Sequence, residues 1–131
     1  MLLSVALLSP PYALLTYASS PWLDGFSWRE GLRVAVPLGR GGVRTGLVLG
    51  CAKEDADALP AGVTAREIIW PLEREPLLPR THLELIRHMA LRQCVSAGQI
   101  FACVLPVGLR VARARLRSLA GGKARILSLK D

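Results

Sequence analysis

Apolar and polar positions divide the chain into a strand-rich first part and a helical second part. Residues 2–8 form a short run that is apolar except for Ser4, and residues 12–17 form a second run with a tyrosine at each end. Both runs have the length of buried strands, although the pattern alone leaves a helix open for the first. Residues 63–70 predict a further strand. Pro10 and Pro11 separate the first two runs, because a residue before proline prefers an extended conformation.

Residues 31–50 carry the most regular pattern, with two apolar arms on either side of a turn rich in glycine and arginine. Pro37 is expected to end the first arm, because proline cannot donate to a sheet ladder. The glycines that follow allow positive φ angles and the close approach of another backbone. These features predict a curled hairpin with Arg40 and Arg44 near its tip. After the hairpin, the polar residues 53–62 predict an exposed acidic loop.

Residues 71–79 contain three prolines and predict a linker. After this linker, the spacing of apolar residues becomes that of a helix. Apolar residues then recur at helical spacing from Pro79 to Gln93. Ser96 with Gln99 fits a capping box for a second helix, which Pro106 is expected to end. We therefore predict an α+β fold. A small, strongly curled antiparallel β-barrel of OB-like size occupies residues 1–70, and two helices that pack against its side lie in residues 71–110.

Length and charge refine this picture. A chain of 131 residues fits one domain with a tail, and its net charge of +7 suggests a polyanionic partner. The charge is uneven: up to Arg110, 11 Lys and Arg face nine Asp and Glu, whereas six face one afterwards. Residues 111–131 therefore form a basic tail. They offer little apolar area against the entropy cost of ordering, so we expect them to be poorly ordered.

Several function classes are disfavoured by the sequence. Three widely spaced cysteines without a C-x-x-C pair predict buried free thiols in a reducing cytoplasm rather than a zinc site or a disulfide framework. Neither histidine falls into a convincing catalytic triad. The sequence G-G-K-A at residues 121–124 lacks the earlier glycine and the final hydroxyl residue of a P-loop. This chain alone is therefore not expected to be an enzyme. Its apolar start is too short to span a membrane, so no membrane partner is expected.

Three motifs occur together in one order along residues 2–110. The hairpin reads G-x-R-V-x-V-P-x-G-R followed by G-x-V, residues 75–79 read E-P-L-L-P, and G-Q-I at 98–100 precedes L-P-x-G-L-R at 105–110. This arrangement resembles the N-terminal 3′ DNA-binding domain of the primosomal protein N′ (PriA) family of replication-restart helicases. One departure is L-R-Q-C at 91–94, where the family usually has a helix end with two tyrosines.

The resemblance implies a DNA-binding module that recognises the 3′ end of a nascent strand at a stalled fork. It also implies that a winged helix and helicase lobes follow in the parent protein, so we expect this chain to be a fragment that ends in the next domain. The parent would be a cytoplasmic, ATP-dependent DNA helicase that uses ATP, Mg²⁺ and Zn²⁺ and assembles with primosome proteins. No cofactor is expected for this chain itself.

The family's 3′-end pocket maps by position onto Leu15, Thr16, Tyr17, Gly39 and Arg66. Tyr17 and Gly39 match the family, and Arg66 keeps the charge of a lysine while adding a planar fork. Leu15 replaces an aromatic residue and Thr16 a carboxylate, so base discrimination should be weak; Leu15 could equally be a core residue. The resemblance implies that Tyr17 stacks on the terminal base or contacts its edge.

The glycine-rich turn offers cations and free backbone N–H groups, which phosphates require. Its candidate phosphate contacts are Arg40, Gly41, Gly42 and Arg44. A second interpretation stays open: a small-barrel module for protein–protein interaction, with a basic tail that belongs to the next domain. Trp22, Phe26 and Trp28 lie in one predicted loop and would suit it as exposed anchors. The same three residues could instead cap the end of the barrel.

Overall fold

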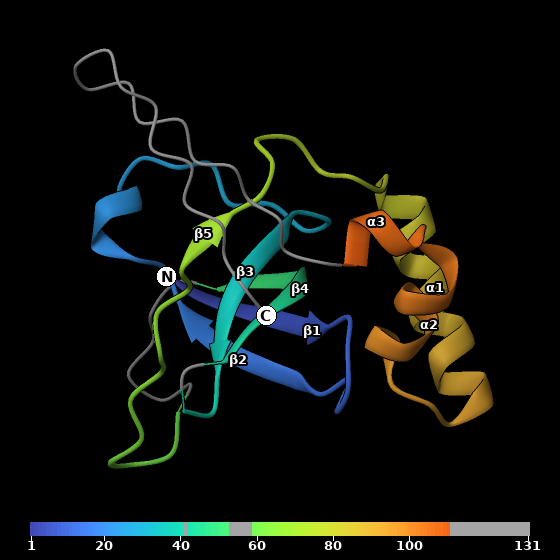
Figure 1. Ribbon diagram of the computed structural model, residues 1–131, viewed down its shortest axis with the longest axis horizontal. Helices are drawn as coiled ribbons and strands as arrows, with labels where there is room; N and C mark the ends of the chain where they lie inside the picture. Colours follow the sequence, from blue (N-terminus) through green and yellow to red (C-terminus); the bar gives the residue numbers. More distant parts are fainter. Residues whose placement is uncertain (41, 53–58, 111–131) are drawn as a thin grey trace.

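The computed structural model describes residues 1–40, 42–52 and 59–110. Five antiparallel strands form one sheet in the order β2-β1-β4-β3-β5, and the α-helices follow the last strand along the chain. Figure 1 shows the α-helices gathered on one flank of the sheet. The strands are β1 (Leu2–Leu7), β2 (Leu14–Ala18), β3 (Arg33–Leu38), β4 (Gly42–Ala52) and β5 (Trp70–Pro71). The helices are η1, a 3-10 turn (Pro21–Leu23), α1 (Arg80–Gln93), α2 (Ala97–Val104) and α3 (Val107–Arg110).

The sheet is neither closed nor strongly curled, so the predicted barrel is not shown. β2 and β5 are its edges, and one isolated bridge between Ala18 and Glu67 links β2 to the segment before β5. The predicted strand over residues 63–70 is also largely absent, because the short strand β5 (Trp70–Pro71) overlaps it at Trp70 alone. The backbone of this segment forms hydrogen bonds to two different strands: Ile68 N donates to Ala18 O of β2, whereas Ile69 N donates to Ala35 O of β3. Neither partner strand receives enough bonds for a continuous ladder.

The β3–β4 hairpin confirms the central prediction, with one correction at Pro37. β3 continues to Leu38, and Pro37 pairs with Val43 rather than ending the strand. The phase of the ladder explains this. Arg33 O and Ala35 O accept bonds from the β5 side, and in an antiparallel strand alternate residues bond to the same side. The missing N–H of Pro37 therefore falls on the outer side of β3 and costs no bond to β4.

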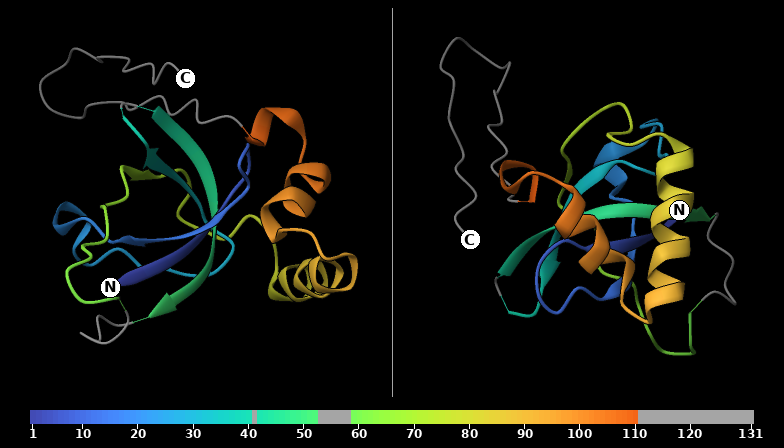
Figure 2. Two further views of the ribbon diagram at one scale, coloured as in Figure 1. Left: turned by 90° about the horizontal axis from the view of Figure 1, so that it is seen from below. Right: turned by 90° about the vertical axis from the view of Figure 1, so that its right-hand side faces the viewer.

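Two apolar clusters hold the fold together. One lies between the sheet and the helices, with Leu47 of β4 and Phe101 of α2 among its fully buried members. The other lies on the opposite side of the strands and includes Tyr17, Val34 and Val48. Figure 2 shows α1 and α2 packed beside the sheet, which confirms the predicted packing of both helices.

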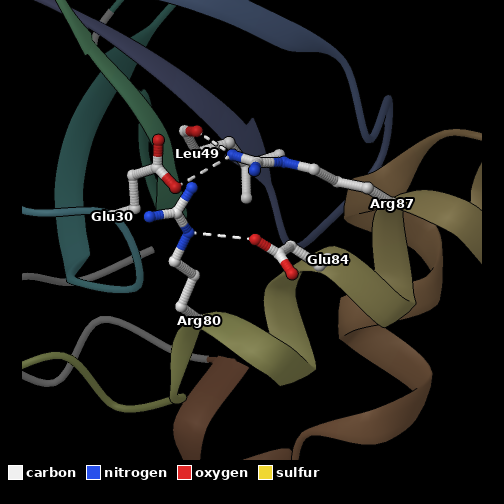
Figure 3. A network of polar contacts seen from close by, with 5 residues as sticks. All are labelled: Glu30, Leu49, Arg80, Glu84 and Arg87. Carbon is white, nitrogen blue, oxygen red and sulfur yellow. Dashed lines mark hydrogen bonds and ion pairs between the residues drawn. The ribbon is translucent and has the colours of Figure 1, made fainter.

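Polar contacts fix α1 against the sheet as well. Arg87 of α1 donates to the Leu49 carbonyl oxygen and lies 3.4 Å from a carboxylate oxygen of Glu30 (Figure 3). On the same helix Arg80 pairs with Glu84 at 2.9 Å, one turn further along. Because the Arg87 contact joins α1 directly to β4, it sets the position of the helix along the strand.

Helix α2 begins and ends beside the residues that the sequence predicts, Ser96 and Pro106. The Ser96 hydroxyl accepts a hydrogen bond from Gln99 N at 3.3 Å, as in the first half of a capping box. Leu105 is extended before Pro106, so α2 ends at Val104 as predicted. The sequence did not predict α3, which begins directly after this proline. Four residues are too few to show a helical period.

The cysteines are free, as expected, but all three are exposed rather than buried. Cys94 takes a left-handed conformation after α1, and Cys103 lies on the outer side of α2, outside the apolar stripes that the clusters bury. Cys51 is exposed as a residue, but partial desolvation of its thiol, together with the nearby Glu30 carboxylate, raises the pKa of that thiol. In the part of the chain that is described, no helix is long and apolar enough to cross a membrane. The acidic residues 53–58 and the tail 111–131 lie outside the described residues.

Candidate nucleic-acid interface

The β3–β4 turn, β2 and the segment before β5 meet at one place through two hydrogen bonds. Arg66 Nη1 donates to Gly39 O at 2.9 Å, and the Tyr17 hydroxyl donates to Pro37 O at 2.9 Å. Three of the five residues mapped from the family pocket, Tyr17, Gly39 and Arg66, are therefore brought together. We call this place the Gly39–Arg66 site.

Backbone pairing explains why Arg66 reaches the hairpin. Ala18 N donates to Arg66 O at 2.9 Å, and Ile68 N returns a bond to Ala18 O at 3.0 Å. This pairing holds the backbone around Arg66 against the end of β2, with its exposed side chain directed to the turn. Gly39 has a φ of +61°, and a Cβ atom there would meet nothing within 4 Å. Glycine is thus favoured here by the left-handed backbone rather than by lack of space.

Tyr17 is a buried member of the site, with 3% of its surface exposed. Burial raises the pKa of its phenol, and the opposing effect of the Arg66 charge is smaller. The hydroxyl therefore stays protonated at neutral pH and can donate to Pro37 O. Because the ring is covered, its face is not offered to a base in this structure. This geometry favours a role in supporting the turn over the stacking role that the resemblance implies.

Leu15 and Thr16 are not brought into the site through their side chains. Leu15 is half-buried and packs on the same cluster as Tyr17, which agrees with its interpretation as a core residue. Thr16 is exposed beside its cross-strand neighbour Ser4, since successive side chains of a strand point to opposite faces. The backbone groups of Thr16 are not paired with β1. Leu7 N donates to Ala13 O, and because every second residue of an antiparallel strand bonds to the same neighbour, Leu15 and Tyr17 also face β1. The backbone groups of Thr16 therefore point outward along the open edge of β2.

The turn itself presents one unpaired cation among the described residues, Arg40, which is exposed. Arg44 is half-buried, and its Nη1 donates to Val43 O at 3.2 Å. Gly42 pairs with Leu38, and a Cβ there would lie 2.8 Å from Leu38 O. Gly41 lies outside the described residues. Of the four predicted phosphate contacts, Arg40 is therefore the one whose charge is most available to DNA.

We expect Arg40→Ala to weaken DNA binding by removing one phosphate contact. The plot of log K against log[salt] should flatten by about 0.7–0.9, the value for one released counterion. Arg92→Ala is the matched control, because it removes an exposed arginine from α1 without touching the turn. The measurement is a salt titration of fork binding by fluorescence anisotropy. An equal flattening by both variants would show that only net charge matters.

Aromatic residues after β2 separate into two groups. Phe26 and Trp28 are tilted against each other with ring centroids 4.6 Å apart, and both pack on the cluster that contains Tyr17. This agrees with the interpretation of the two rings as a cap on one end of the core. Trp22 is 91% exposed and does not take part in that packing.

In the described part of the chain, no three His, Cys, Asp or Glu residues gather closely enough to hold a metal ion. The described residues thus supply no ligand set for the Zn²⁺ that the resemblance implies for the parent protein. The groups that the interface offers to a ligand are guanidinium groups, the carbonyl oxygens of the turn and the outward backbone N–H and C=O groups of β2. Groups of these kinds can bind phosphates and the edges of sugars or bases.

An antiparallel sheet with flanking helices and an exposed arginine on a glycine turn is compatible with a small nucleic-acid-binding domain. The family model described as the 3′ DNA-binding domain (3′BD) of PriA matches residues 4–106, and the chain belongs to this family. It is a domain that binds DNA 3′ ends in the replication-restart helicase. A search of curated proteins finds no match.

Proposed function

We propose that the 3′ end of a nascent strand binds at the Gly39–Arg66 site. The observation that carries this proposal is the hydrogen bond from Arg66 to Gly39 O beside that from Tyr17 to Pro37 O. Arg66 is exposed, and a guanidinium carries five N–H donors, so donors remain for a phosphate or a base edge. Arg40 and Arg44 lie on the same hairpin and would contact the phosphates that follow.

Recognition of a free 3′-hydroxyl follows from the acceptors at this site. The nearest backbone groups are the carbonyl oxygens of Pro37 and Gly39, which can each accept a further hydrogen bond through a second lone pair. A hydroxyl can donate to them, whereas a 3′-phosphate has only acceptor oxygens and a negative charge. We therefore expect the domain to bind a recessed 3′-OH end more tightly than the same end with a 3′-phosphate.

Base recognition at the end should be weak. Thr16 lacks the carboxylate that the family pattern places there, and its side chain lies on the face away from Tyr17. The outward N–H and C=O of Thr16 can bond to a base edge, but every base presents some donor or acceptor to such a pair. Affinities for the four terminal bases should thus differ little.

We further propose that the chain works as part of a longer helicase. In this proposal residues 1–70 carry the DNA site, residues 71–110 form the helical subdomain, and residues 111–131 lead to the next domain. ATP, Mg²⁺, Zn²⁺ and the primosome proteins would be bound by the parent protein outside the DNA site. The single match that supports this proposal is the family assignment over residues 4–106.

The test compares two forks that differ only at the nascent 3′ group, hydroxyl or phosphate, by fluorescence anisotropy. The wild-type domain should prefer the hydroxyl. Arg66→Ala should lower affinity for the hydroxyl fork roughly 10- to 100-fold, because a hydrogen bond to a charged group contributes about 1.5–3 kcal/mol. Arg66→Lys should recover part of the loss, because it restores the charge without the planar fork.

Tyr17→Phe tests whether the turn is positioned through Pro37. The variant keeps the buried ring and removes only the hydroxyl, so preference for the 3′-OH should fall while the melting temperature changes little. Arg92→Ala again serves as the control on α1 and should behave as wild type. Equal binding of the two forks by the wild-type domain would contradict the proposed function.

A further inference from the structure

The outer edge of β3 presents a row of backbone carbonyl oxygens. Arg33 O and Ala35 O accept hydrogen bonds from N–H groups of the chain around β5. Alternate residues of a strand bond to the same side, so Pro37 O continues this row. The donors to Pro37 O and Gly39 O are side chains, one from β2 and one from the segment before β5. The row therefore ends in two carbonyl oxygens that are reached from the same side.

Each of these two oxygens can accept a second hydrogen bond. A carbonyl oxygen has two lone pairs, and the bonds from Tyr17 and Arg66 use one on each oxygen. Pro37 has no N–H, so at this residue the edge offers an acceptor without a donor beside it. Pro37 is half-buried and Gly39 is exposed. A ligand that satisfies both oxygens must therefore bring two donors.

The spacing of the two oxygens suits one small group. Only Leu38 separates Pro37 from Gly39, and two residues of chain span at most about 7 Å. An O–H···O bond is about 2.7–2.8 Å long, so two such bonds cover about 5.5 Å. Two hydroxyls on adjacent carbon atoms supply the remaining length between them. A vicinal diol can therefore bridge the two oxygens even at the upper limit of their separation.

The sugar at a strand end determines how many donors it brings. A terminal deoxyribose has one hydroxyl, which fills one acceptor and leaves the other to water. A terminal ribose has its 2′- and 3′-hydroxyls on adjacent carbon atoms. The 2′-hydroxyl is also the group by which proteins distinguish RNA from DNA at a given site. The two acceptors thus match a ribose end better than a deoxyribose end.

We propose that the Gly39–Arg66 site prefers a strand that ends in a ribonucleotide, whose 2′- and 3′-hydroxyls donate to Pro37 O and Gly39 O. This inference rests on the proposed function, because it places the same 3′ end at the same site and names the sugar. Arg66 has donors left for the phosphate of that nucleotide, and Arg40 is exposed for those that follow. A deoxyribonucleotide end binds as well, with one contact fewer.

The test compares forks that are identical except for the last nucleotide of the nascent strand. A ribonucleotide end should bind roughly 2- to 10-fold more tightly than a deoxyribonucleotide end, the effect of one additional neutral hydrogen bond. A 2′-O-methyl end keeps the 3′-hydroxyl and the ribose ring but loses the 2′ donor, so it should lose this gain. The ratio between ribose and deoxyribose ends should not change with salt, because a hydroxyl contact releases no counterion.

Two variants separate preference from affinity. Arg40→Ala should weaken binding of both ends alike and leave their ratio unchanged, because Arg40 is placed at the phosphates. Arg92→Ala, which removes an exposed arginine from α1, should behave as wild type. A ratio that fell to one in Arg40→Ala would locate the preference at the phosphates and overturn the proposal.

A competition experiment distinguishes a strand end from a free ribonucleotide. Adenosine 5′-monophosphate has the same diol but no further phosphates for Arg40, so it should compete much more weakly than the ribonucleotide-ended strand. Equal competition would overturn the assignment to a strand end, and so would equal binding of 2′-O-methyl and ribose ends. The comparison of 3′-hydroxyl with 3′-phosphate on deoxyribonucleotide forks tests the proposed function separately. A hydroxyl preference there without any ribose preference would refute this inference alone.

Discussion

Gly98→Ala should destabilise the domain by roughly 2–4 kcal/mol, at or above the usual cost of overpacking a core. Gly98 lies in the first turn of α2, where the helix meets β1. A Cβ atom there would sit 2.2 Å from Leu7 O and 3.1 Å from Tyr12 O, and both are backbone atoms that cannot rotate away. The helix would have to move off the strand, which would open the cluster around Phe101. Urea denaturation followed by circular dichroism measures the loss.

Gly108→Ala is the matched control in another helix. A Cβ atom at Gly108 would meet nothing within 4 Å, and its φ is not in the left-handed region. Alanine is favoured over glycine inside helices by up to about 1 kcal/mol, so this variant should be neutral or slightly stabilised. If Gly98→Ala and Gly108→Ala gave the same midpoint, α2 would not lie as close to β1 as described.

The elements that the sequence predicts well are those defined by local chemistry. The β3–β4 hairpin follows from apolar arms around a glycine turn, and α2 follows from Ser96 at its start and Pro106 after its end. Tertiary partners decide the parts that the sequence misses. The segment before β5 has the composition of a strand, but its hydrogen bonds go partly to β2 and partly to β3.

The candidate site could be predicted only in part, for a similar reason. Position matching selects Tyr17, Gly39 and Arg66, and the structure joins them through the turn. The period of two along β2 already separates Thr16 from Tyr17, so the opposite placement of the Thr16 side chain was readable from the pattern. The burial of the Tyr17 ring was not, because it depends on apolar residues from other strands, such as Val34 and Val48.

Glu73→Ala should cost about 3 kcal/mol, because it leaves the guanidinium of Arg33 without its anion in a mostly buried position. The two side chains are 13% and 20% exposed and form an ion pair, and the Glu73 carboxylate also accepts from Arg33 N at 3.0 Å. Arg33 Nη1 further donates to Leu109 O at 2.7 Å, so the same guanidinium joins β3 to α3. Loss of Glu73 should therefore lower the urea midpoint and speed amide exchange in residues 107–110.

Glu75→Ala removes a carboxylate two residues further along and is the matched control. Glu75 pairs with Arg29 at 3.1 Å, but both side chains are more than half exposed, so solvent screens the pair and its loss should cost less than about 1 kcal/mol. Glu73→Gln keeps an oxygen acceptor for Arg33 N while removing the charge, and should fall between the two. Similar midpoints for Glu73→Ala and Glu75→Ala would mean that burial of the Arg33 pair does not stabilise the attachment of α3. The order Glu75→Ala, Glu73→Gln, Glu73→Ala in increasing cost is the expected result, because each step leaves the buried guanidinium with fewer partners.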